Sequence, residues 1–420
     1  MSVTADATRR LRAWMADHER EMIDLLAEIV NLDTSTLNRD GVERLAGLMS
    51  TRLRALGFSV ERFAPTPPRE DWVNNAFLDG RGAEAIAPGV LARLGGGSGQ
   101  GRLLLLAHLD TAFPPGEPSR TPFRIAGGRA YGPAVADMKG GVVGVLFACR
   151  ALLETGVARP AEITVVYDTD EQAGTVCSRA LIEAEARRAD WGLVTESGRS
   201  GGQVVGQRAG LAMGELIVEG VEAHLGTGYR EGRSAIDAIC RKVTALHALH
   251  DPDKGVLLNV GEIAGGTRRN LFAAHAVARM DVRVVDATTW ERVQRQIETI
   301  AAAEEPRGTR ATLHLWQHRP PMPWTAATDG LAALVAEAAA AMGTRIDTIP
   351  TMGGSDANLI AAQGTPALCG LGPVGGAVMT RDEYIELPTL AERAALVAAL
   401  AHALSLGTTA TQTTTLQSLR

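Results

Sequence analysis

No stretch of the sequence approaches the roughly 18 consecutive apolar residues that a helix needs to cross a bilayer. The four cysteines, Cys149, Cys177, Cys240 and Cys369, are isolated, and their spacing matches neither a disulfide framework nor a CxxC metal site. The first stretch of the chain mixes charged with apolar residues and lacks the apolar core of a secretory signal. These absences predict a soluble protein of a reducing, cytoplasmic compartment.

An excess of positive charge is also missing. The 48 Asp and Glu residues outnumber the 42 Lys and Arg residues, which gives a formal net charge of −6. We therefore expect no nucleic acid and no membrane surface among the partners. The composition, with 45% hydrophobic and 21% charged residues, is that of a globular protein. A chain of 420 residues is long enough for two or three domains.

Residues 1–208 are expected to form an α/β segment. Apolar residues recur at three- and four-residue steps over the first 57 residues, which predicts helices. Continuous apolar runs follow at 90–94, 103–106, 163–167 and 193–196, and such runs predict strands of a sheet that is covered on both faces. An apolar helical stretch between two of these runs favours βαβ units.

A second pattern interrupts the first. Residues 209–321 follow the order β-α-β-β-α-β, which predicts an inserted ferredoxin-like α+β domain. Residues 322–407 return to the α/β pattern, so we expect the first domain to be built from two chain segments. Residues 408–420 are polar and simple in composition, and we expect a mobile tail there.

Polar residues that can bind metal stand at the ends of the predicted strands, where open α/β sheets place their sites. His108 and Asp110 are two residues apart, so the carboxylate could meet the second imidazole nitrogen and fix its tautomer. The same pair could be a purely structural hydrogen bond. Asp137 precedes a glycine pair at the start of a predicted helix, and it could be a metal ligand or a plain N-cap.

Three acidic residues, Asp168, Asp170 and Glu171, follow the next strand. Carboxylates this close together repel one another unless a cation or a proton intervenes. Either a metal site or a solvated loop would explain them. Glu196 ends a further apolar strand, where an ordinary acidic residue is the simplest interpretation.

In order, the stretches HLDT, ADMKGG, DE before a glycine, and TES resemble the co-catalytic zinc peptidase family. That family includes aminoacylase, glutamate carboxypeptidase and succinyl-diaminopimelate desuccinylase. The sequence GGSDA at 353–357 also matches, and the likeness extends over nearly the whole chain. The resemblance implies a zinc-peptidase-like catalytic domain and an inserted lid through which two subunits form a homodimer.

The resemblance also implies roles for individual residues. His108, Asp137 and Glu196 correspond to the ligands of one zinc ion, and Asp137 to the carboxylate that bridges two ions in the family. Asp110 corresponds to the residue that orients the histidine. Glu171 corresponds to the general base that takes a proton from the attacking water.

At the second zinc position the sequence departs from the family. Gln172 stands where the family has a glutamate ligand, and the stretch GGAVMTRDEY has Val378 and Met379 where the family has a histidine. A neutral amide is a weaker ligand than a carboxylate, so we expect one retained ion. Whether Gln172 touches metal, or whether His247 or His250 substitutes, stays open at this point.

The predicted lid carries further residues that correspond to family positions. His224 resembles the histidine that reaches across the dimer to stabilise the oxyanion. The other positions, which in the family hold the substrate, are Asn270, Arg283 and Arg319 in the predicted lid, and Gly353 and Gly354 in the segment that follows it. Arg283 could equally be an ordinary salt-bridge residue of a strand.

The first expectation for function is a metal-dependent amidohydrolase. It would cleave the amide bond of an N-acyl amino acid or a small peptide with a free carboxylate, using zinc. Two alternatives remain. The enzyme could run a non-hydrolytic step, such as acyl transfer, cyclisation or elimination, or the chain could be a non-catalytic protein that binds a carboxylated ligand.

Overall fold

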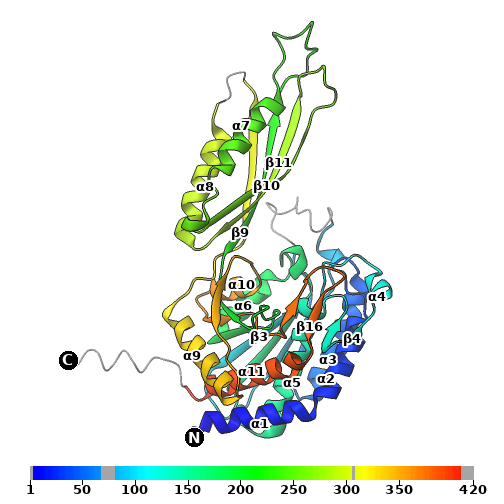
Figure 1. Ribbon diagram of the computed structural model, residues 1–420, viewed down its shortest axis with the longest axis vertical. Helices are drawn as coiled ribbons and strands as arrows, with labels where there is room; N and C mark the ends of the chain where they lie inside the picture. Colours follow the sequence, from blue (N-terminus) through cyan, green and yellow to red (C-terminus); the bar gives the residue numbers. More distant parts are fainter. Residues whose placement is uncertain (1–2, 68–80, 305–307, 408–420) are drawn as a thin grey trace, which may run out of the picture. The chain divides into compact units, whose positions relative to one another are not determined.

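The computed structural model describes residues 3–67, 81–304 and 308–407 (Figure 1). The predicted mobile tail, residues 408–420, lies outside the described residues. Contacts divide the chain into two compact units. Unit 1 contains Met1–Gln207, Trp324–Thr351 and Ser355–Arg420, and unit 2 contains Arg208–Pro323 and Met352–Gly354. Among the described residues, no helix combines the length and apolar character needed to span a membrane.

Unit 1 is built on a six-stranded sheet with the order β1-β2-β6-β3-β7-β14. The strands are β1 (Ser59–Phe63), β2 (Gly89–Leu94), β3 (Arg102–His108), β6 (Glu162–Asp168), β7 (Trp191–Val194) and β14 (Ala367–Leu368). Strand β3 runs parallel to both β6 and β7. The carboxyl ends of these three strands therefore meet at one edge of the sheet, and the site residues follow them there.

The apolar run of β3 is buried on both faces, as its sequence predicts. Leu103, Leu104, Leu105 and Leu106 are each at most 1% exposed, although successive side chains of a strand point to opposite faces. Helices of unit 1 supply the covering layers: α1 (Val3–Asp17), α2 (Glu19–Val30), α3 (Arg39–Ala55), α5 (Gly140–Thr155), α6 (Arg179–Arg188), α9 (Ala326–Ala341), α10 (Ala357–Ala361) and α11 (Pro388–Ser405). The predicted α/β class is confirmed.

Unit 2 has the predicted β-α-β-β-α-β order. Its elements are β9 (Gly210–Glu219), α7 (Ala235–His247), β10 (Val256–Gly265), β11 (His275–Val284), α8 (Ala287–Ala302) and β12 (Arg310–Arg319). The strands form an antiparallel sheet with the order β10-β11-β9-β12. Buried and half-buried residues alternate along β9, so the sheet buries one face more deeply, with helices α7 and α8 packed against it.

A second small sheet in unit 1 was not predicted. It joins β15 (Gly375–Gly376), β16 (Tyr384–Glu386), β5 (Arg129–Tyr131) and β4 (Arg124–Ala126). These strands have two or three residues each and contain no continuous apolar run, so the sequence offers no periodic signal for them. The sheet brings the C-terminal segment against the turn before α5, since a Cβ added at Gly375 would lie 2.6 Å from the Cβ of Ala136.

Candidate metal and catalytic site

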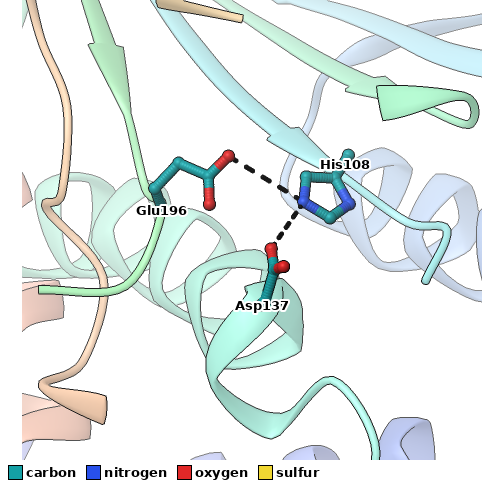
Figure 2. Close-up of side chains that lie close together, drawn as sticks. All are labelled: His108, Asp137 and Glu196. Carbon is teal, nitrogen blue, oxygen red and sulfur yellow. Dashed lines mark hydrogen bonds and ion pairs between the residues drawn. The ribbon is translucent and has the colours of Figure 1, made fainter. Parts of the chain in front are cut away.

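A buried histidine and two carboxylates converge at the edge of the main sheet (Figure 2). His108 is the last residue of β3, and Glu196 lies two residues beyond the end of β7. The His108 Nε2 atom is 3.0 Å from Asp137 Oδ1 and 3.9 Å from Glu196 Oε1. Among the described residues, these three form the one group of His, Cys, Asp or Glu side chains whose ligand atoms all lie within 4.8 Å of one another.

Asp137 reaches this group from the turn that precedes α5. The turn spans Val135–Lys139, and α5 begins at Gly140 with Lys139 at its N-cap position and no side-chain cap. The alternative that Asp137 is an N-cap is therefore wrong. Its carboxylate faces His108 and Gln172 instead.

The tautomer of His108 follows from its hydrogen bonds. Its Nδ1 atom donates to the backbone oxygen of Asp110 at 3.0 Å, because a carbonyl oxygen can only accept. When the ring is neutral, as a metal ligand must be, its unprotonated Nε2 faces Asp137 and Glu196. In the absence of a cation, burial disfavours the charged ring, but hydrogen bonds to Asp110 and Asp137 and the charges of Asp137 and Glu196 favour it more strongly. The net effect raises the pKa of His108 well above its ordinary value.

The side chain of Asp110 does more than orient the imidazole. Its Oδ1 atom lies 3.4 Å from His108 Nδ1, whereas the backbone oxygen of Asp110 lies 3.0 Å from the same nitrogen. The carboxylate accepts hydrogen bonds from the backbone N–H groups of Glu171 and Gln172, both at 3.2 Å, and from the Thr36 hydroxyl at 2.7 Å. Asp110 therefore also positions the turn that carries Glu171.

The donor set fits a divalent cation. One imidazole nitrogen and two carboxylates are typical ligands of a zinc ion that keeps a position open for catalysis. Two carboxylates that face one neutral imidazole repel each other, so this arrangement is favourable only if a proton or a cation lies between them. We infer that His108, Asp137 and Glu196 are the residues that would hold the ion.

The residue that stands where the family has a second zinc ligand is an amide that contacts Asp137. Gln172 donates from Nε2 to Asp137 Oδ2 at 3.2 Å. Val378 and Met379 are exposed to 38% and 55%, and their apolar side chains supply no charge for a cation. His247 and His250 lie in unit 2, where His250 Nδ1 is 3.2 Å from both the backbone nitrogen and the backbone oxygen of Leu258.

Glu383 is a site residue that the sequence interpretation missed. Its side chain is 1% exposed and accepts from the backbone N–H groups of Ala136, Asp137 and Met379 at 2.8, 3.0 and 3.0 Å. Burial, together with the Asp137 charge, raises the pKa of Glu383 to about 7. Only its place in the DEY stretch could have marked it, because no periodicity shows that this residue is buried.

The acidic run after β6 is not a solvated loop. Asp168 and Asp170 are both fully buried, and burial is the main cause that raises the pKa of Asp168 well above its usual value and that of Asp170 to about 7. Asp170 accepts from the backbone N–H of Cys177 at 2.6 Å. Glu171 follows them in the short turn Glu171–Ala173 and is half-buried.

Unit 2 contains the predicted oxyanion histidine. His224 is exposed, and its Nδ1 atom accepts from the backbone N–H of Gly226 at 3.2 Å. The neutral ring therefore carries its proton on Nε2, as a donor needs. Asn270 is close by, because its backbone oxygen accepts from Leu225 and the next residue, Leu271, pairs with His224.

The predicted substrate-binding arginines stand at the other end of unit 2. Arg283 donates to Asp281 at 2.9 Å and to the backbone oxygen of Met352 at 3.2 Å, so the salt-bridge alternative describes its contacts. Arg319 ends β12 and is 2% exposed. Arg208, which was not predicted, donates to the backbone oxygens of Gly353 and Gly354.

Comparison with known proteins agrees with this geometry. A model of peptidase family M20/M25/M40 matches residues 104–403. The chain belongs to this family. It is therefore a metal-dependent hydrolase that acts on amide bonds, and the predicted family is confirmed.

Relatives of this M20 family member support the same conclusion. Carboxypeptidase G2 of a Pseudomonas strain is 28% identical over 390 residues, 91% of this chain and 89% of the relative. An acetylornithine deacetylase of Myxococcus xanthus is 31% identical over 293 residues, 66% of this chain and 70% of the relative.

Two solved structures show the fold. A tripeptidase of Staphylococcus aureus has a TM-score of 0.76 at 20% identity, covering 92% of this chain and 98% of its own. A dinuclear metal-binding M20 peptidase of Bacillus subtilis has a TM-score of 0.65 at 14% identity, covering 93% of this chain and 99% of its own. The fold prediction is thereby confirmed.

Proposed function

We propose that this M20 family member hydrolyses the amide bond of an N-acyl amino acid or a small peptide with a free carboxylate, using a single zinc ion. The observation that carries the proposal is the convergence of His108, Asp137 and Glu196 at the edge of the sheet. The names of the relatives support the substrate class, since they include a carboxypeptidase, an acetylornithine deacetylase and succinyl-diaminopimelate desuccinylases.

In this proposal each residue of unit 1 has a separate task. His108, Asp137 and Glu196 would hold the zinc ion, which would supply Lewis acidity toward the substrate carbonyl. Glu171 accepts a proton from the attacking water and later gives it to the leaving nitrogen. Asp110 holds the Glu171 turn through its hydrogen bond to the Glu171 N–H at 3.2 Å.

Unit 2 would act as a lid that carries the remaining groups. The lid of the partner subunit would supply His224, whose Nε2 would donate to the developing oxyanion, and Asn270 lies beside His224 in the same unit. Arg283 and Arg319, together with the segment at Gly353 and Gly354, would hold the substrate carboxylate, because a guanidinium can bind a carboxylate with two parallel hydrogen bonds.

We also propose that the lid mediates a homodimer. Large apolar side chains are exposed on unit 2, among them Val221 (47%), Leu225 (58%), Tyr229 (55%) and Ile263 (52%). Three of them lie within residues 221–229, and exposed apolar side chains mark a protein interface where they form one contiguous patch. Light scattering should give twice the mass of one chain, and a monomer at micromolar concentration would contradict this part of the proposal.

Replacement of Glu171 by Gln tests the catalytic role. The variant should bind zinc with the parental stoichiometry but lose hydrolysis by about 100-fold or more, because general-base catalysis contributes on the order of 100- to 10,000-fold. The measurement is release of the free amino acid from a panel of N-acyl amino acids and dipeptides. Parental turnover in the variant would refute the role of Glu171.

A second candidate is a non-hydrolytic reaction on a related substrate, and Gln172 together with Val378 favours it. With fewer charges at the site, water activation is weaker, and another nucleophile could take the acyl group. Reaction in ¹⁸O-labelled water separates the two candidates. Hydrolysis places one labelled oxygen in the acid product, whereas acyl transfer, cyclisation or elimination does not.

A further inference from the structure

The two carboxylate oxygens of Asp137 have different partners. Oδ1 lies 3.0 Å from His108 Nε2, within the ligand group, while Oδ2 accepts a hydrogen bond from Gln172 Nε2 at 3.2 Å. One oxygen therefore faces the candidate ion site and the other faces a neutral amide. The Asp137 side chain is 11% exposed. Water therefore has little access to replace the amide as the hydrogen-bond donor to Oδ2.

Both partners of the Asp137–Gln172 hydrogen bond are held by further contacts. The backbone N–H of Gln172 donates to Asp110 Oδ2 at 3.2 Å, and the short helical turn Glu171–Ala173 closes with the N–H of Gly174 bonded to the oxygen of Glu171 at 2.8 Å. On the other side, Glu383 accepts from the backbone N–H of Asp137 at 3.0 Å. The amide is thus aimed at Oδ2 by a fixed backbone.

The chemistry of the amide decides what this contact can do. An amide nitrogen donates hydrogen bonds without carrying a charge, so it satisfies the outer carboxylate oxygen but does not neutralise it. The full negative charge of Asp137 then remains available to the ion that His108 and Glu196 would share. An ammonium or a second cation at Oδ2 would withdraw part of that charge.

We propose that Gln172 is a positioning residue: its amide holds Asp137 as a one-oxygen ligand of a single divalent cation and fills the place where a second cation would contact Oδ2. This inference rests on the proposed metal site. It assigns Gln172 a hydrogen-bonding role and removes it from the set of metal ligands.

The first test measures ion binding in the absence of substrate. Replacing Gln172 by Ala should raise the dissociation constant for Co²⁺ roughly 10- to 100-fold, the usual effect of losing a partner of a metal ligand, and should change the visible absorption bands of the Co²⁺ protein. Gln100→Ala, at an exposed position of unit 1, is the matched control and should change neither quantity. Circular dichroism and thermal melting of the chelator-treated proteins show whether the variant is folded.

An unchanged dissociation constant together with an unchanged Co²⁺ spectrum in folded Gln172→Ala would overturn the proposal. If Gln172→Ala does not fold, Gln172→Leu gives the same comparison, because leucine keeps much of the side-chain volume but cannot donate to Oδ2.

The second test counts ions. The parent should bind one Co²⁺ per chain, and the double variant Gln172→Glu/Val378→His, which adds a carboxylate and an imidazole, should bind two. Two tightly bound ions in the parent, or one in the double variant, would contradict the idea that the amide occupies the second position. Because neither count depends on turnover, a parent that binds one ion and hydrolyses no substrate would refute the proposed function and leave this inference standing.

Discussion

At the scale of single residues, Glu383 shows how one buried carboxylate can order the backbone of a site, since it accepts from three backbone N–H groups. Replacing it by Ala would leave three backbone N–H groups without their acceptor, at a cost of roughly 1–3 kcal/mol for each buried donor that stays unpaired. We expect a lower free energy of unfolding in urea and weaker Co²⁺ binding. Glu383→Gln should lose less, because its amide oxygen can still accept from Ala136 and Asp137.

The control for this comparison is Glu386→Ala, three residues along the chain. Glu386 pairs with Arg129 at 2.8 Å, and the two side chains are 38% and 40% exposed, so its loss should cost less than about 1 kcal/mol. Equal destabilisation by Glu383→Ala and Glu386→Ala would show that the three backbone contacts of Glu383 carry little weight.

At the scale of elements, helix α9 shows that chemically identical residues of one helix differ in burial. Its last turns contain a run of alanines, of which Ala339 is fully buried while Ala340 is exposed. Ala339→Leu should lower the unfolding free energy by roughly 1–3 kcal/mol, because a close-packed core has no room for the added methyl groups. Ala340→Leu, with the same chemical change at the next, exposed position, should stay within about 0.5 kcal/mol. Thermal melting of both variants is the measurement, and equal melting points would contradict this assignment of faces.

At the scale of the whole molecule, the four cysteines report on the two units separately. Cys240 is exposed in unit 2, whereas Cys149, Cys177 and Cys369 are buried in unit 1. Burial raises the pKa values of Cys149 and Cys177 to about 12, and a thiol without its thiolate form reacts slowly. A thiol reagent should therefore label one cysteine per native chain and four in denaturant, and Cys240→Ser should label none while native.

The course of labelling across a denaturant series adds a test of the division into units. Three thiols should become reactive in one step when unit 1 unfolds, because all three lie within it. Fast labelling of more than one thiol in the native protein would contradict the burial of Cys149, Cys177 and Cys369.

Periodicity made much of the fold predictable. The four-leucine run became the buried β3, and the β-α-β-β-α-β order of unit 2 is that of the sequence pattern. The short strands β4, β5, β15 and β16 could not be predicted, because elements of two or three residues contain too few side chains to show a period. The contact of Glu383 with the Asp137 turn depends on that unpredicted sheet.

The chemical groups of the site can be identified from the amino-acid order alone: a histidine and acidic residues at strand ends, and an amide and a valine in place of two ligands. Strand ends are local features, and the parallel arrangement of β3, β6 and β7 brings them to one edge. The partner of each group emerges only from the folded chain. The folded chain shows that Asp137 is no N-cap, that Asp168 and Asp170 are buried, and that Gln172 donates to Asp137. These outcomes depend on contacts between segments far apart in the chain, and no local pattern records such contacts.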